Sequence, residues 1–190
     1  VCVGCGPSKP TQEEAVAAIE ALGGFAEVDK NGAAAAGSFG DTKDTDAVLI
    51  HLKGLTKIET LYLENTNVTD AGLEHLKGLT NLQTLRLYQT KVTGAGLGHL
   101  KGLTNLQKLD LLGTKVTDAG LAHLKGLTNL KELRLPQEVT DAGLVHLKGL
   151  TKLEILDLYR TNVTDEGVKK LQKALPNCAI GNGSMYTPTR

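Results

Sequence analysis

The chain has 190 residues, with 21 lysines and arginines against 21 aspartates and glutamates, so its formal net charge is zero. This balance argues against a nucleic-acid partner, because nucleic-acid-binding proteins carry a basic excess or a basic stripe. Aromatic residues are 3% of the chain and no apolar run approaches the roughly 20 residues of a membrane-spanning helix, so leucine and valine must fill the core and a membrane contact would need a lipid anchor.

Residues 1–10 are expected to form a flexible N-terminal segment. Val3-Gly4-Cys5 followed by Gly-Pro-Ser-Lys-Pro resembles the cleavage site of bacterial lipoproteins, in which a small residue precedes the lipidated cysteine. The resemblance implies a lipid on Cys5 and a location in the cell envelope or outside the cell. Alternatively, Cys2 and Cys5 are inert thiols in an unstructured terminus, and the protein is cytoplasmic.

Residues 11–44 are expected to cap the N-terminal end of the domain. Residues 11–30 are predicted to be helical, with Thr11 as N-cap, Glu14 completing a capping box and Gly23-Gly24 ending the helix. The expected buried face consists of Ala15, Ile19 and Leu22. Residues 31–44 look like a degenerate copy of the unit that follows. They have Ala34 and Gly37 at leucine positions and Asp44 at a valine position.

Residues 45–175 contain five copies of one unit of 23 or 24 residues. The segment HLKGL begins at His51, His75, His99, His123 and His146. Val-Thr-Asp-Ala-Gly-Leu or a close variant begins at Val68, Val92, Val116, Val139 and Val163. The unit L-x-x-L-x-L-x-x-T-x-V-T-D-A-G-L resembles a leucine-rich repeat, and its second half is similar to the cysteine-containing subfamily, found in bacteria. The cysteine position of that subfamily is held by Thr66, Thr90, Thr114 and Thr161.

The resemblance implies an α/β leucine-rich repeat solenoid, a right-handed horseshoe with parallel strands on its concave face and helices on its convex face. The residue pattern agrees with this fold. Leu85 and Leu87 alternate with polar residues as in a half-buried strand, and Leu97, Leu100 and Leu103 recur on one side of a helix. A single unit cannot offset its own conformational entropy, so the units must stack. Exposure of Leu85 or Leu109 would contradict this register.

Two segments depart from the repeat. Residues 135–139 form a connection that is one residue short and contains Pro136, which removes a backbone donor, so we expect a local irregularity in the stack there. Residues 176–190 are expected to form a C-terminal cap and tail. A last helix on Val168, Leu171 and Leu175 should end at Pro176, with Cys178 and Ile180 beginning a closing strand.

No residue pattern indicates catalysis. The three serines Ser8, Ser38 and Ser184 lie outside any nucleophile motif, and paired carboxylates occur only as rows of repeat positions. The five histidines form such a row, and on a convex surface a row of side chains diverges instead of converging on a metal. We therefore expect no enzymatic activity, no cofactor and no metal.

The variable strand positions predict a protein-binding surface on the concave face. One row lies between the two strand leucines and consists of Tyr62, Arg86, Asp110, Arg134 and Asp157. The next row consists of Glu64, Tyr88, Leu112, Pro136 and Tyr159. Tyrosine and arginine are favoured at interface hot spots. The alternative for the charged residues is a lateral ion ladder that merely stabilises the sheet.

The sequence therefore predicts a non-catalytic protein-binding scaffold whose partner it does not identify. The alternative function is that of a structural or assembly subunit of a larger envelope complex, packing through its convex helices or its terminal caps.

Overall fold

The computed structural model describes residues 11–28, 34–39 and 45–181. Within these residues, eight strands form one sheet in chain order. They are β1 (Phe25–Val28), β2 (Ala34–Ser38), β3 (Thr60–Tyr62), β4 (Thr84–Arg86), β5 (Lys108–Asp110), β6 (Glu132–Arg134), β7 (Ile155–Asp157) and β8 (Ala179–Gly181). β1 is antiparallel to β2, and each later pair of neighbours is parallel.

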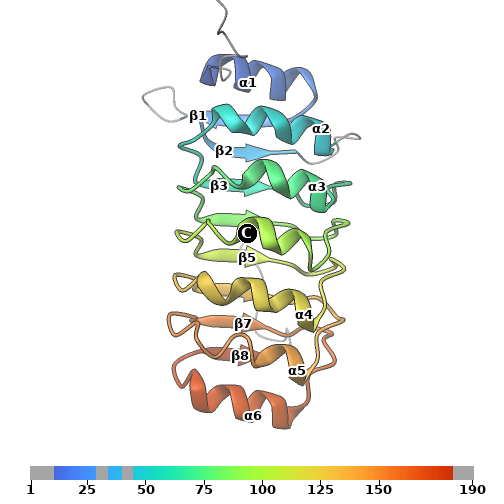
Figure 1. The fold of residues 1–190 in the computed structure, drawn as a ribbon, viewed down its shortest axis with the longest axis vertical. Helices are drawn as coiled ribbons and strands as arrows, with labels where there is room; N and C mark the ends of the chain where they lie inside the picture. Colours follow the sequence, from blue (N-terminus) through green and yellow to red (C-terminus); the bar gives the residue numbers. More distant parts are fainter. Residues whose placement is uncertain (1–10, 29–33, 40–44, 182–190) are drawn as a thin grey trace, which may run out of the picture.

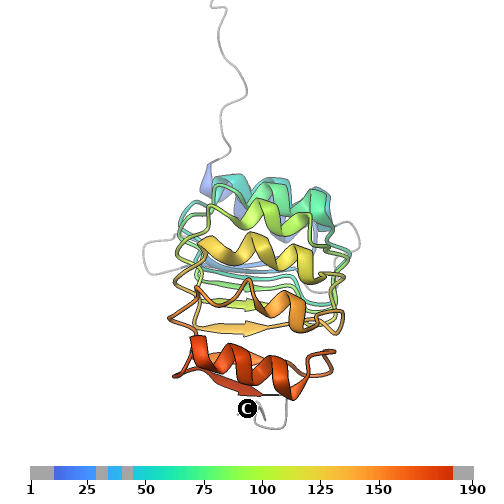
Figure 2. The same cartoon turned by 60° about the horizontal axis from the view of Figure 1, so that its bottom comes forward.

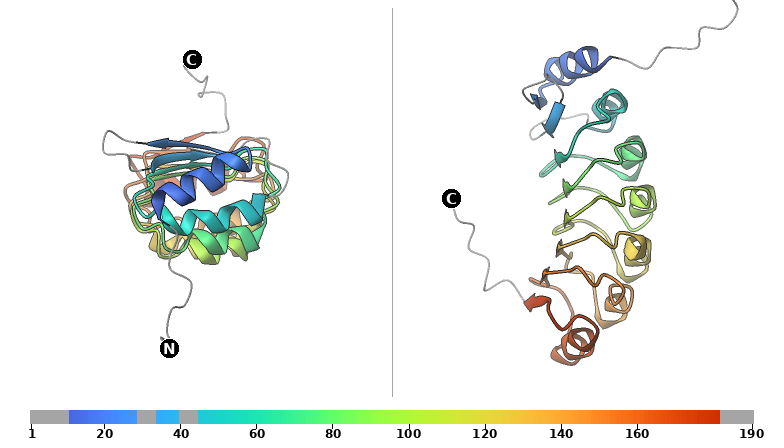
Figure 3. Two further views of the ribbon diagram at one scale, coloured as in Figure 1. Left: turned by 90° about the horizontal axis from the view of Figure 1, so that it is seen from above. Right: turned by 90° about the vertical axis from the view of Figure 1, so that its left-hand side faces the viewer.

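The helical segments cover one face of this sheet along its length (Figures 1 and 2). They are α1 (Gln12–Ala21), α2 (Thr45–Leu49), η1 (Ile50–Gly54), α3 (Asp70–Leu73), η2 (Glu74–Leu76), η3 (Gly96–Leu100), α4 (Asp118–Leu121), η4 (Ala122–Gly126), α5 (Asp141–Leu144) and α6 (Asp165–Ala174), where η marks 3₁₀ helix. The array bends toward its strands, so the strands lie on the concave side and the helices on the convex side (Figure 3).

The repeated leucines form one continuous core between strands and helices. Leu85 is 0% exposed and Leu109 is 2% exposed, which confirms the predicted register. Each residue in a parallel strand pairs with the equivalent residue of the next repeat, as Leu85 pairs with Leu109. The separation in sequence is one residue shorter between Leu133 and Leu156, because the fourth repeat is one residue short. Each repeat therefore adds one layer of leucines to those of its neighbours.

Hydrogen bonds between aspartate and threonine also join the repeats on the helical side. Both carboxylate oxygens of Asp70 accept hydrogen bonds from Thr93 of the next repeat, one from the backbone N–H at 2.7 Å and one from the hydroxyl at 2.6 Å. The same two bonds join Asp46 to Thr69, Asp118 to Thr140 and Asp141 to Thr164. In each case a Cβ on the glycine three residues after the threonine would collide with the carboxylate. The aspartate of one repeat and the threonine and glycine of the next thus interlock.

One interface lacks this bridge. Gly94 stands where the other repeats have aspartate, and the Thr117 hydroxyl makes no capping hydrogen bond to the helix that follows it. The two backbones approach closely instead, since a Cβ on Gly120 would lie 2.5 Å from the Gly94 Cα. The leucine core, the strand pairing and hydrogen bonds such as those from Gln107 to Gln83 and from Asn129 to Thr104 hold this interface without an aspartate bridge.

The threonines at the cysteine position close the turn after each strand. The hydroxyls of Thr66, Thr90 and Thr114 are buried and donate to the carbonyl oxygen three residues earlier at 2.7–2.8 Å. The residue before each threonine has a positive φ, 71° at Gly113 for example. Burial of a polar side chain is tolerated here because its hydrogen bond is formed within the turn.

The fourth repeat lacks both features of this turn, and the irregularity lies within residues 135–139, as predicted. The Val139 N–H donates to the Pro136 carbonyl at 3.2 Å, which makes a tighter connection. Strand pairing continues on the other side of it, with Arg134 still opposite Asp157. The missing residue is therefore absorbed in the loop and does not interrupt the sheet.

The N-terminal cap agrees with the sequence in part. Thr11 and Glu14 form the expected capping box at the start of α1. α1 ends at Ala21, just before the predicted stop at Gly23-Gly24, and residues 25–28, for which no strand was predicted, form β1. Leu22 was expected on the buried face but is 49% exposed, because it lies at the C-cap where the chain leaves the helix.

Of the predicted degenerate repeat, the structure describes residues 34–39, which contain strand β2. Gly37 pairs with Leu61 and so occupies a leucine position, while Phe39 lies two residues further on and is 0% exposed. A single phenylalanine there offsets part of the volume lost at Ala34 and Gly37. Asp44 lies outside the described residues.

The C-terminal end closes as expected. α6 ends at Ala174, two residues before Pro176, and β8 follows it as the last strand. Cys178 is 4% exposed, and burial raises the pKa of its thiol to about 11. Residues 1–10, with the candidate lipidation site Cys5, and the tail 182–190 lie outside the described residues.

Candidate functional site

The concave surface carries three rows of outward side chains, one residue from each strand per row. The central row is the first one predicted, since Tyr62, Arg86, Asp110, Arg134 and Asp157 are partners in register. A second row precedes it and consists of Thr60, Thr84, Lys108, Glu132 and Ile155. The third row follows the strands and contains Glu64, Tyr88, Leu112, Pro136 and Tyr159.

Part of the central row forms the alternative ion ladder. Nη1 of Arg134 lies 3.0 Å from Oδ2 of Asp110, and Nε of the same arginine lies 4.0 Å from Oδ2 of Asp157. Arg86 does not continue the ladder toward Asp110, because its nearest ion pair is with Glu64 at 3.3 Å. The ladder therefore spans three strands at the C-terminal side of the surface.

Asp110 and Pro136 are buried, which corrects their placement on a contact surface. Asp110 is 7% exposed, and its Oδ1 accepts the Leu112 N–H at 3.0 Å while Oδ2 meets Arg134. Both carboxylate oxygens of Asp110 are therefore engaged within the chain, one with the turn after β5 and one with Arg134 on the neighbouring strand. Leu112, expected to be exposed, is only partly exposed.

The N-terminal half of the surface is aromatic. The guanidinium of Arg86 lies 5.1 Å from the centroid of the Tyr62 ring, within the range of a cation–π contact. Tyr62, Tyr88 and Glu64 are half-buried, whereas Arg86 is exposed. An arginine fixed between an aromatic ring and a carboxylate presents its remaining donors in a defined direction.

Phe25 is a member of this surface that the sequence prediction missed. It is opposite Ser38 on β2, which is in turn opposite Tyr62, so Phe25 extends the central row by two strands. It is 62% exposed, the highest value among the large hydrophobic residues described. The signal available in the sequence was the break at Gly23-Gly24 followed by Phe-Ala-Glu-Val, a short run that contains an aromatic and a β-branched residue, both favoured in strands.

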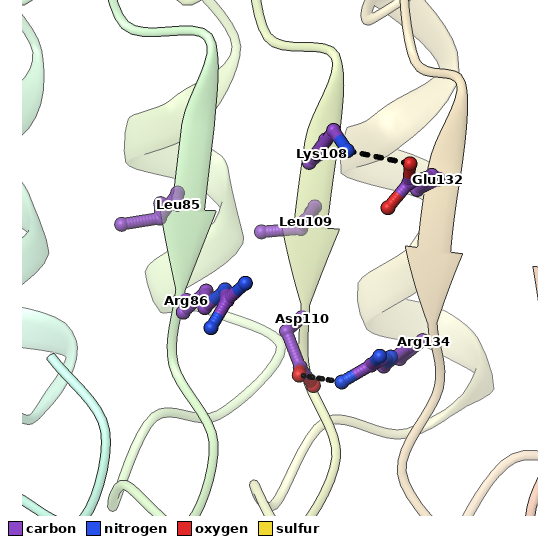
Figure 4. A pocket seen from close by; sticks show the side chains of 7 residues that line it. All are labelled: Leu85, Arg86, Lys108, Leu109, Asp110, Glu132 and Arg134. Atoms are coloured by element: carbon purple, nitrogen blue, oxygen red, sulfur yellow. Dashed lines mark hydrogen bonds and ion pairs between the residues drawn. The ribbon is translucent and has the colours of Figure 1, made fainter. Parts of the chain in front are cut away.

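Figure 4 shows the middle of the surface, where Lys108 and Glu132 pair at 2.6 Å beside the Arg134–Asp110 pair. These side chains line a hollow of about 40 Å³ together with Leu85, Arg86 and Leu109. Pockets for small ligands usually measure about 300–1,000 Å³. The geometry therefore suits contact with an extended surface better than enclosure of a small molecule.

The histidine row on the convex side is partly buried. Nδ1 of His75 and of His146 is enclosed without a hydrogen-bonding partner. Burial lowers the pKa of His75, with a further contribution from nearby Lys53, so this imidazole is neutral at pH 7. Within the part of the chain that the structure describes, no three histidine, cysteine or acidic side chains converge as a metal site would require.

Parallel strands on the concave side, short helices on the convex side and leucines stacked at every repeat define an α/β leucine-rich repeat solenoid. Residues 56–116 match the family model described as Leucine rich repeat, and residues 149–171 match a second model of the same description, which supports the leucine-rich repeat fold. The cysteine-containing subfamily is not among these matches.

A solved structure has a similar fold. Internalin C2 from Listeria monocytogenes is similar over 95% of this chain and 94% of its own, with 26% identity and a TM-score of 0.60. A second internalin of that organism, InlF, is similar over 68% of this chain and 42% of its own, with 23% identity and a TM-score of 0.49. No curated protein matches the chain in sequence. None of the helices in the described residues is long and apolar enough to span a membrane.

Proposed function

We propose that this protein is a non-catalytic scaffold that binds a protein partner through the aromatic half of its concave surface. The observation that carries the proposal is the cluster of Phe25, Tyr62, Arg86 and Tyr88 on neighbouring strands, with Phe25 and Arg86 exposed. Aromatic and arginine side chains supply most of the binding energy at protein interfaces. The likeness to internalin C2 over nearly the whole chain supports a role in interaction at a bacterial surface.

The C-terminal half of the concave surface has a different role in this proposal. Asp110 and Asp157 both lie within ion-pair distance of Arg134, so these three charges are engaged within the chain and are less available to a partner. Tyr159, 39% exposed, adds apolar area at the edge of this half. We assign the affinity to the aromatic half and the spacing of the strands to the ion ladder.

The test compares Tyr88→Ala with Lys101→Ala, a convex-side control, in a pull-down from the native source followed by titration of the captured partner. Loss of a hot-spot tyrosine should weaken binding by at least ~2 kcal/mol, about thirty-fold. The lysine variant should bind as the wild type does, and the two variants should unfold at the same temperature. A loss confined to Lys101→Ala would place the interface on the convex helices and favour the assembly-subunit alternative.

We further propose that the protein acts in the cell envelope or outside the cell, held by a lipid on Cys5. The support is the Val3-Gly4-Cys5 pattern in the sequence and the bacterial source of the similar structures. Mass spectrometry of protein from its native cells should find a diacylglycerol adduct on Cys5 and no residue before it. An unmodified peptide that runs through Val1-Cys2-Val3 in mature protein would refute the lipid anchor.

A further inference from the structure

The outer face of α1 is acidic. α1 packs against η1 and β1 with Ala15 and Ile19 buried. Its opposite face carries three exposed carboxylates around two exposed alanines, namely Glu13, Glu14, Ala17, Glu20 and Ala21. The helix contains no lysine or arginine. Small residues at the centre of this face would let another helix approach closely.

The outer face of α6, at the opposite end of the array, is basic (Figure 1). Lys169 and Lys173 are exposed one turn apart, and among the described residues neither has a carboxylate partner within ion-pair distance. Lys170 reaches Glu166 only at 3.9 Å. Lys169 and Lys173 line an open hollow of about 410 Å³ with Glu166 and Gln172.

Helix stability does not account for these charges. Carboxylates favour the first turn of a helix and cations favour the last turn, which explains Glu13, Glu14 and Lys173. Glu20 lies in the last turn of α1, where the helix dipole disfavours it, and Lys169 lies in the first half of α6. Glu20 makes the outer face of α1 wholly acidic. Lys169 joins Lys170 and Lys173 in a basic cluster, although the same face also carries Asp165 and Glu166 in its first turn.

Apolar groups accompany the charges at the two ends. Leu22, Phe25 and Val28 follow α1 and are 49%, 62% and 50% exposed. At the other end, a hollow of about 470 Å³ lies between the last strand and α6, and its apolar lining includes Val168 and Ile180. One end of the array thus projects apolar side chains, and the other offers a recess.

We propose that the protein associates head to tail, with the acidic α1 end of one copy docked on the basic α6 end of a second copy. Such a contact is heterologous, because it uses two different surfaces and leaves one end of each kind free for a further copy. A two-fold contact of α1 with α1 would oppose carboxylates, so the charges favour the head-to-tail arrangement. Phe25 belongs to both surfaces, so this contact covers the N-terminal edge of the concave surface and leaves Tyr62, Arg86 and Tyr88 open.

The test is sedimentation velocity of the full chain at low ionic strength, over a concentration series reaching about 1 mM. We expect the average sedimentation coefficient to rise with concentration. The rise should be suppressed in high salt, since charges near a surface are screened beyond about 8 Å at 0.15 M salt and over shorter distances above it. A chain that remains monomeric throughout the low-salt series would overturn the proposal.

Charge reversal identifies the surfaces. Glu13→Lys/Glu20→Lys and Lys169→Glu/Lys173→Glu should each weaken self-association by at least about tenfold, because each makes both ends carry one sign. An equimolar mixture of the two variants should associate again, since every end then meets its opposite. Matched controls are Glu74→Lys/Glu132→Lys and Lys125→Glu/Lys148→Glu, in the middle repeats and outside both caps. Equal losses in the controls, or no association in the mixture, would refute the end-to-end contact.

Discussion

At the residue scale, Asp118 is bound to Thr140 of the next repeat through both of its carboxylate oxygens, at 2.8 and 2.7 Å. Asp118→Ala should lower the free energy of unfolding by about 1–3 kcal/mol, because a charged acceptor is removed and the Thr140 donors lose their partner. Urea titration of the variant measures this. Lys125→Ala, at an exposed position in the same repeat, is the control and should stay within about 0.5 kcal/mol of the wild type. Equal stability of the Asp118 and Lys125 variants would contradict the bridge.

Cys178 makes the stability of the C-terminal end depend on pH. Its pKa is raised in the fold to about 11 from 9.0, so the unfolded chain loses the thiol proton first as the pH rises. Stability should therefore be independent of this group below pH 9 and fall as the pH rises from 9 toward 11. The check is the difference between wild type and Cys178→Ala in urea titrations at pH 7, 9 and 10.5. A wild-type chain that loses no more stability than the variant over this range would contradict the buried thiol.

At the element scale, the interface between the repeats of Gly94 and Gly120 should be the one that opens most readily. The Thr93 and Thr140 N–H groups are bonded to aspartates, whereas Thr117 faces Gly94. We expect the Thr117 amide to exchange with deuterium faster than those of Thr93, Thr140 and Thr164, because local opening requires fewer bonds to break. Residue-resolved exchange by NMR decides this. Equal protection of the four amides would mean that the core alone fixes these turns.

The repeats themselves could be predicted because the copies within the chain can be aligned with one another. Five copies of one unit fix which leucines are buried, and Leu85 and Leu109 confirm the register. The bridges between repeats could not be predicted, because an aspartate in the first turn of a helix is already explained by the helix dipole. Its contact with a threonine 22 or 23 residues away depends on how the repeats stack.

In the candidate site, too, positions set by the repeat pattern could be predicted, and contacts between repeats could not. The rows of Tyr62, Arg86 and Tyr88 follow from strand periodicity and lie where they were predicted. Asp110 was placed correctly in its row, but its burial depends on Arg134, one repeat away. Phe25 was missed because β1 is an antiparallel hairpin strand outside the repeat, so the period gives no information about it.

At the scale of the whole molecule, the array is a one-dimensional stack in which each layer contacts its neighbours. The apolar core at each end of the stack must therefore be covered by its own cap. α1 covers the N-terminal layer through Ala15 and Ile19, and α6 with β8 covers the C-terminal layer through Leu171 and Cys178. A change in a cap should act mainly on the layers next to it, which distinguishes this fold from a domain with one central core.

Ile19→Ala tests this locality. Ile19 is 0% exposed, so its truncation should cost about 2–5 kcal/mol through lost burial and the cavity left behind. The cost falls on the end of the stack, so deuterium exchange should rise in α1, β1 and β2 and remain close to wild type in β5, β6 and β7. Leu22→Ala, at a position that is 49% exposed, should change neither region. If exchange in the Ile19→Ala variant rises equally in all eight strands, the stack unfolds as one cooperative unit and the cap is part of a single core.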